Sequence, residues 1–119
     1  AVSMCSLAAN STNTCTVGAA TWANGWIVFV DSANRGVVDA GEEIVRVQQP
    51  PANIASIAST VPSSDVARIT FEANGLAKAA NRTLIVTPTG VVPANGTRLI
   101  CVSITGRPSV REEGVAACP

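Results

Sequence analysis

The amino-acid sequence predicts a mainly β domain, and three observations support this fold class. About seven short segments show strand-like apolar patterns and are separated by turn-forming Gly, Pro and Asn residues. No segment keeps a helical apolar period over the length of a convincing long helix. The chain has 119 residues and is 47% hydrophobic but only 13% charged, which indicates a β-rich extracytoplasmic domain. At this length, residues 1–119 are expected to form one domain with a sizeable core.

The segment formed by residues 22–47 is the most informative part of the chain. Residues 25–30 are a dense apolar run that predicts a buried strand. Residues 31–43 are polar and contain two glycines, which indicates a loop. Residues 43–48 alternate in polarity and predict a half-solvated strand. Together they predict a long hairpin. Because it holds both tryptophans and one of the two phenylalanines, we expect the core to condense around it.

The remaining elements are shorter. They are predicted from the alternation of apolar and polar residues and from the Gly, Pro and Asn residues that interrupt it. The other expected strands are residues 1–7, 65–72, 83–87 and 98–105. The apolar residues of segment 54–61 are spaced three and four apart, which fits a weak helix or an irregular strand equally well. Asn74-Gly75 and residues 93–96 are strong turn signals. Residues 106–108, Gly-Arg-Pro, are expected to end the last strand and to leave a short tail.

The four cysteines lie near the two ends of the chain, at Cys5, Cys15, Cys101 and Cys118. Their even number and the absence of a C-x-x-C spacing favour disulfides over a metal or redox site. Three pairings are possible. We favour Cys5–Cys15 with Cys101–Cys118, because each pair closes a short loop and would contribute about 3 kcal/mol. The alternative is four buried thiols in a cytosolic protein. Disulfides would place the chain in a periplasm or outside the cell.

The composition argues against an enzyme. The chain has no histidine, the commonest general base and metal ligand. A serine with Lys78 is the remaining nucleophile–base option, and Lys78 is expected in a polar hairpin loop. Neighbouring glutamates would diverge on a strand, and no glycine-rich phosphate loop occurs. The formal net charge is zero, so bulk charge recruits neither nucleic acid nor an anionic membrane. We expect no cofactor.

The loop predicted at residues 31–43, called the acidic loop below, partly matches a twelve-residue calcium loop. Asp31, Gly36, Asp39 and Glu42 fall at positions 1, 6, 9 and 12, which suit the ligands and turn of an oxygen-binding cation. Alanine and arginine occupy positions 3 and 5, where oxygen ligands belong, and the flanking elements are strands. Asp31, Asp39 and Glu42 are therefore the calcium candidates, and we predict no calcium binding in the micromolar range. The alternative interpretation is a solvated hairpin loop.

The stretch W-A-N-G-W-I-V-F-V-D…N-R-G-V-V-D-A-G-E-E-I-V-R-V, within residues 22–47, closely resembles the central signature of the GspH/FimT family. This family contains the H-type pseudopilins of type II secretion and the FimU- and FimT-like minor pilins of type IV pili. M-C-S-L resembles its first strand, I-T-F-E-A-N-G at residues 69–75 its strand and turn, and L-I-C-V-S-I-T-G-R at residues 99–107 its last long strand. The resemblance covers essentially the whole chain.

The resemblance implies a β-rich domain of two packed antiparallel sheets and a structural, non-enzymatic role. Family members carry an N-terminal hydrophobic helix that anchors the subunit in the inner membrane and later packs in the filament core; it is missing from this chain, which starts abruptly at Ala1. The globular domain would face the periplasm and then be extracellular in the pilus. The implied partners are other minor pilins at the pilus tip, where they prime assembly for twitching motility. Paired cysteines favour a FimU-like minor pilin over an H-type pseudopilin.

Some FimT-like members bind DNA for natural transformation through a C-terminal G-R-x-R motif. Residues 106–111 here read G-R-P-S-V-R, so the second arginine is displaced. The candidate DNA-binding residues are Arg98, Arg107 and Arg111. Glu112 and Glu113 follow directly, and no aromatic residue lies nearby to stack on bases. A DNA-binding receptor pilin is therefore the alternative, and we predict weak or no DNA binding at physiological salt.

Overall fold

The computed structural model describes residues 1–16, 22–33, 36–60, 68–78, 82–90 and 96–112. These residues form a short 3-10 helix, η1 (Trp22–Asn24), and nine strands. The strands are β1 (Val2–Ser6), β2 (Trp26–Val30), β3 (Ile44–Gln48), β4 (Ile54–Thr60), β5 (Arg68–Phe71), β6 (Ala77–Lys78), β7 (Arg82–Pro88), β8 (Arg98–Val102) and β9 (Pro108–Glu112).

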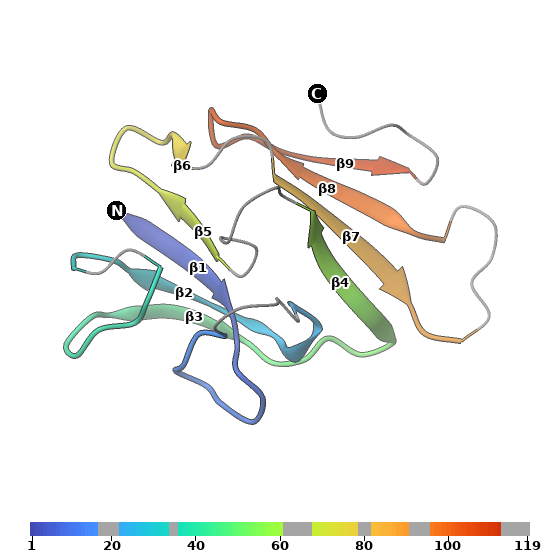
Figure 1. Cartoon of the computed structure of the whole chain (residues 1–119), viewed down its shortest axis with the longest axis horizontal. Coiled ribbons are helices and arrows are strands. Elements are labelled where there is room, and N and C mark those ends of the chain that lie inside the picture. The colour runs from blue at the N-terminus through green and yellow to red at the C-terminus, as the bar shows by residue number, and fades with distance from the viewer. Residues whose placement is uncertain (17–21, 34–35, 61–67, 79–81, 91–95, 113–119) are drawn as a thin grey trace.

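Two antiparallel sheets face each other, as Figure 1 shows. In the described part of the chain, one sheet has five strands in the order β3-β2-β1-β5-β6, and the other has four in the order β4-β7-β8-β9. The mainly β fold with two packed antiparallel sheets is thus confirmed. The predicted hairpin is also present, because β2 pairs antiparallel with β3. In the described residues no helix combines the length and the apolar character that a membrane crossing needs.

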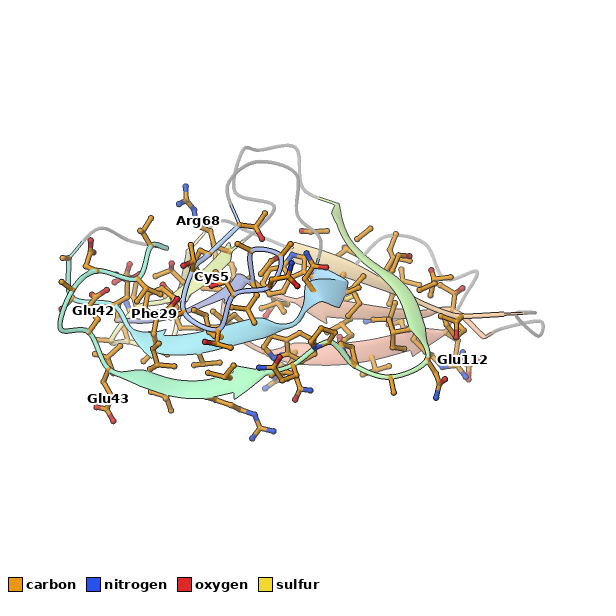
Figure 2. All side chains as sticks on the ribbon, turned by 90° about the horizontal axis from the view of Figure 1, so that it is seen from below. Cys5, Phe29, Glu42, Glu43, Arg68 and Glu112 are labelled. Carbon is orange, nitrogen blue, oxygen red and sulfur yellow. A yellow bond between two sulfur atoms is a disulfide. The ribbon has the colours of Figure 1, made fainter. Side chains whose placement is uncertain are left out.

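The five-stranded sheet buries side chains on both of its faces. Successive residues of a strand point to opposite faces. Cys5 is paired with Ile27 and therefore shares one face with it, and both are fully buried. Met4 on β1 and Ile69 on β5 are paired on the opposite face, which packs toward the second sheet. Figure 2 shows the two layers and labels Cys5 on the side of the five-stranded sheet that is turned away from the second sheet.

Two apolar clusters follow from this arrangement. The larger one lies between the sheets and includes Trp22, Ile57 and Ile69. The smaller one lies on the other face of the five-stranded sheet, where Ile27 and Phe29 are among the buried residues. The aromatic hairpin therefore contributes to both clusters. The core therefore includes the hairpin, as expected, but it is divided between two faces, because adjacent strand residues point to opposite faces.

Gly25 shapes the junction between η1 and β2. Its φ of 99° is in the left-handed region, and a Cβ at this position would lie 2.2 Å from the main-chain oxygen of Gln48. Its own carbonyl accepts the N–H of Leu7 at 3.0 Å. Only a residue without a side chain lets the end of η1 approach β1 and β3 this closely.

The C-terminal segment differs from the sequence prediction. Gly-Arg-Pro at residues 106–108 was expected to end the β structure, but it forms a turn followed by β9, which pairs with β8. The reason is the position of Pro108, the first residue of a strand at the sheet edge, where a missing N–H does no harm. The turn also shortens the predicted strand 98–105 to Arg98–Val102.

The remaining expectations concern the middle of the chain. The ambiguous segment 54–61 forms the strand β4, which pairs with β7 and has a register shift between Ile54 and Ser56, so the irregular-strand interpretation is confirmed. Lys78, expected in a polar hairpin loop, lies instead in the two-residue strand β6 (Ala77–Lys78). The turn predicted at residues 93–96 lies mostly outside the described residues, as does the first part of the strand predicted at 65–72.

Candidate functional site

A groove of about 290 Å³ lies between the two sheets. The five-stranded sheet contributes Met4, Trp26 and Ile69 to its wall, and the four-stranded sheet contributes Leu84 and Ile100. Among the residues that the structure describes, all of those that line it are of apolar types. The two sheets therefore pack without filling the space between them, although interiors of folded domains normally leave few voids larger than a water molecule.

The chemistry of this groove suits an apolar packing partner. Small-molecule sites usually add a few placed polar groups to an apolar wall, because these fix the orientation of the ligand. Among the described residues that line this groove, the only side-chain polar groups are the indole N–H groups of Trp22 and Trp26. Its apolar surface continues onto β9, where Val110 is paired with Ile100 and is 70% exposed. The arrangement can bury aliphatic or aromatic side chains.

The Cys5–Cys15 disulfide is present, as predicted, and it joins β1 to the loop that follows. Cys5 is fully buried, and Leu7 forms an isolated antiparallel bridge with Cys15 beside the bond. Cys101 is buried in β8 and is also disulfide-bonded. Its predicted partner, Cys118, lies outside the described residues, so the Cys101–Cys118 pairing stays a prediction.

Asp31 is a fully buried carboxylate at the end of β2. Its Oδ2 accepts hydrogen bonds from the Ser3 hydroxyl and from the main-chain N–H of Gly36, both at 2.6 Å. Ser3 Oγ also lies 2.7 Å from Thr70 Oγ1. The main-chain N–H of Asp31 donates to the carbonyl of Ala1 at 2.9 Å. Asp31 thus links β1, β5 and the acidic loop in the interior, so the prediction of a solvated loop is wrong for this residue.

Glu42 closes the acidic loop from its other end. Its Oε1 accepts the main-chain N–H of Asp39 at 2.8 Å, and its Oε2 accepts those of Ser32 and Ala33. These hydrogen bonds, first that from Asp39 and then that from Ser32, lower the pKa of Glu42 below its ordinary value. The Glu42 carboxylate thus supplies acceptors for three main-chain N–H groups of the loop.

The calcium candidates therefore do not converge on one point. Asp31 is directed into the interior toward Ser3, and Glu42 is directed onto main-chain N–H groups of the loop. The main-chain N–H of Asp39 contacts Glu42 from within the same turn. Among the residues that the structure describes, no group of three or more His, Cys, Asp or Glu side chains is placed to hold a metal ion.

The basic candidates are distributed along the β8–β9 hairpin. Arg98 faces Glu112 across the strands, and Arg111 is the neighbour of Leu99, so the two arginines lie at one end but on opposite faces of the sheet. Arg107 lies in the turn at the other end, about four strand residues or roughly 13 Å away. Figure 2 shows Glu112 at the end of the molecule opposite Glu42 and Glu43. The three arginines do not form one cluster.

Two features of the site were not found from the sequence. In the Ser3–Asp31–Thr70 group, Ser3 is 28 positions from Asp31 and 67 positions from Thr70. The one sequence feature that could have indicated this group is a serine on the same face of β1 as Cys5. The groove depends on how far apart the two sheets pack, which no local pattern encodes.

Comparison with protein families places most of the chain in a known family model. The family model described as Type II transport protein GspH matches residues 4–106. This segment runs from the middle of β1 into the β8–β9 turn. It contains the acidic loop, the Cys5–Cys15 disulfide and, apart from Pro108, the residues that line the groove. Neither the curated proteins nor the solved structures contain a match to the chain.

Proposed function

This chain belongs to the type II transport protein GspH family, and we propose from this premise that it is a structural minor pilin of a type IV pilus. In this proposal the domain formed by residues 1–119 helps to prime pilus assembly at the tip through contacts with other minor pilins. The GspH family is one of structural pseudopilins, and the proposed role includes no catalysis.

The observation that carries the proposal is the open apolar groove between the sheets. A free-standing secreted domain has no evident use for about 290 Å³ of apolar space, because a close-packed core would be more stable. A filament subunit has such a use, since the resemblance to GspH/FimT proteins implies a hydrophobic helix that packs in the filament core. We propose that such a helix packs against this groove in the assembled subunit.

The disulfide supports the proposed location. Disulfides persist in oxidising compartments and are rare in the cytosol. The Cys5–Cys15 bond fits a globular domain on the periplasmic side of the inner membrane and later on the cell surface in the pilus.

The second candidate function is that of an H-type pseudopilin in type II secretion. The description of the matched family favours it directly, since it names type II transport. Both candidates use the same fold and the same kind of assembly, and they differ in which filament the subunit enters. DNA binding has less support, because the three candidate arginines do not lie together.

A deletion strain tests the proposal and separates the two candidates. We expect loss of the gene to reduce surface pili, counted by electron microscopy, and to leave type II export of a marker enzyme unchanged. Loss of export with normal pili would support the pseudopilin instead. Normal pili together with normal export would contradict both.

Two complementing variants then test the groove. Leu99 and Ile100 are adjacent in β8 and both half-buried, but only Ile100 lines the groove. We expect Ile100→Ser to fail to restore pili and Leu99→Ser to restore them. Thermal unfolding of each purified domain controls for folding. Equal restoration by the two folded variants would remove the groove from the proposal.

A further inference from the structure

Two hairpin turns from different sheets are joined at one end of the molecule. The β5–β6 turn contains residues 72–76 and the β8–β9 turn contains residues 103–107. The N–H of Ala77 donates to the carbonyl of Ile104 at 2.9 Å, which connects the sheets directly. Gly106 approaches the other turn so closely that a Cβ would lie 2.2 Å from the carbonyl oxygen of Gly75. Figure 1 shows these turns side by side, in yellow and orange. We call them the turn pair.

Each turn is also held by its own hydrogen bonds. In the β8–β9 turn, Ser103 N–H donates to Arg107 O at 3.1 Å and Gly106 N–H donates to Ser103 O at 2.9 Å. In the β5–β6 turn, the N–H of Glu72 donates to the carbonyl of Leu76 at 2.9 Å, and the Gly75 N–H returns to Glu72 O at 2.9 Å. The turn pair is therefore fixed before any partner arrives, which lowers the entropic cost of binding.

The turn pair exposes two large apolar side chains to solvent. Leu76 is 44% exposed and Ile104 is 52% exposed. Arg107 is exposed beside Ile104 in the same turn. No ion pair of the Arg107 guanidinium is found within the described residues, and only its main-chain atoms take part in the turn's hydrogen bonds. A rigid surface with two aliphatic side chains and one available cation is typical of a protein contact.

We propose that the turn pair is a docking surface for another pilin-family subunit, one that presents a carboxylate beside an apolar patch. This inference rests on the proposed function and names the surface through which a neighbouring subunit is bound. The guanidinium of Arg107 would take the carboxylate in a bidentate pair, which fixes orientation. Leu76 and Ile104 would be buried against the partner's apolar patch, which removes their exposed apolar area from water.

The surroundings of Arg107 favour a protein over DNA. Phosphate binding needs several cations, because each contact must compete with salt. Arg98 and Arg111 lie at the opposite end of the hairpin. Leu76 and Ile104, the exposed large apolar side chains of the turn pair, are aliphatic. Phe71, the aromatic side chain beside Gly106, is half-buried and lines the groove, so it is not an open stacking surface for a base.

Calorimetric titration of the 119-residue domain tests this surface. The probes are the purified soluble domains of the other minor pilins of the same assembly system, a second copy of this domain, and a short DNA duplex, each at about 150 mM salt. We expect one minor-pilin domain to bind. We expect Ile104→Ser and Arg107→Glu each to weaken that binding by at least about tenfold, as central contacts of an interface do.

Matched controls come from β3. Val45 is 59% exposed and Arg46 is its exposed neighbour, both far from the turn pair in the sheet order. Val45→Ser and Arg46→Glu should leave the affinity within about twofold, since exposed contacts outside an interface contribute little. All four variants change exposed side chains, and thermal unfolding will verify that they are folded.

Several outcomes would overturn the inference. These are no binding to any minor-pilin domain, equal binding by all four variants, self-association that the turn variants abolish, and duplex binding that only Arg107→Glu abolishes. A deletion strain complemented with the full-length variant distinguishes failure of this docking surface from failure of the proposed function. If deletion removes pili but the full-length Ile104→Ser/Arg107→Glu variant restores them, the docking surface is wrong and the pilin role stands. If deletion leaves pili and export unchanged, the proposed function itself fails.

Discussion

Gly25 shows at the residue scale how one position fixes a junction between elements. Both its positive φ and its approach to the Gln48 carbonyl require the absence of a side chain. Gly41 has a similar φ of 84°, but a Cβ there would meet nothing within 4 Å. The two glycines therefore separate the cost of a left-handed backbone from the cost of a steric clash.

We predict that Gly41→Ala costs roughly 1–2 kcal/mol of the free energy of unfolding, the price of the left-handed conformation alone. Gly25→Ala should cost at least about 1 kcal/mol more, because the new Cβ overlaps the Gln48 oxygen and the backbone must shift. Denaturant unfolding followed by tryptophan fluorescence measures both. Equal losses would show that the close approach at Gly25 relaxes freely.

Ser3 is the second residue whose substitution should lower the stability of the fold. Its hydroxyl donates to buried Asp31 at 2.6 Å and lies beside Thr70. Ser3→Ala removes a donor to a buried carboxylate and should lower stability by about 1–3 kcal/mol. Ser109→Ala on exposed β9 is the control, with an expected change within about 0.5 kcal/mol. If the Ser3→Ala domain is as stable as the Ser109→Ala control, the hydrogen bonds of Ser3 to Asp31 and Thr70 make no net contribution to the free energy of unfolding.

The acidic loop is the element whose order depends most on one side chain. Glu42 accepts main-chain N–H groups from both arms of the loop, at Ser32, Ala33 and Asp39. The pKa of Glu42 is lowered in the folded state, so ionised Glu42 stabilises the fold. That stabilisation is complete above the unfolded value, 4.5, and is lost as the pH falls through the lower folded value.

We therefore predict that Glu42→Gln is less stable than the wild type at about pH 7, and that the difference shrinks as the pH falls below about 4.5. Glu43→Gln is the control, since this exposed neighbour accepts none of these hydrogen bonds. Urea unfolding at a series of pH values gives the comparison. A Glu42→Gln deficit that is independent of pH would contradict this account of the loop.

The elements could be predicted from the sequence where a local pattern decides the structure. Dense β-branched residues and flanking glycines predicted the β2–β3 hairpin, and Asn74-Gly75 predicted the β5–β6 turn. The local rule failed at Pro108, because a proline ends a central strand but is accepted at the start of an edge strand. Whether β9 is an edge strand depends on the order of the sheet, which residues 106–112 do not encode.

At the scale of the whole molecule, the arrangement in two packed sheets could be predicted from the family resemblance. The surfaces of the molecule, the groove and the turn pair, could be recognised only in the structure. The sequence placed Arg107 and Arg111 in one candidate group, and the strand between them separates them. It placed Asp31 and Glu42 in one candidate loop, and the fold directs them to different partners. Distances of this kind depend on register and sheet spacing, which are set by long-range packing.

The measurement that tests the central claim most directly is quantitative mass spectrometry of purified pili sheared from intact cells. A minor pilin that primes assembly enters the filament, so we predict peptides of this domain in the filament fraction, at a small fraction of the amount of the major pilin. Their absence from the filaments, with the protein present in the membrane fraction of the same cells, would contradict the claim that this chain is a structural subunit of the pilus.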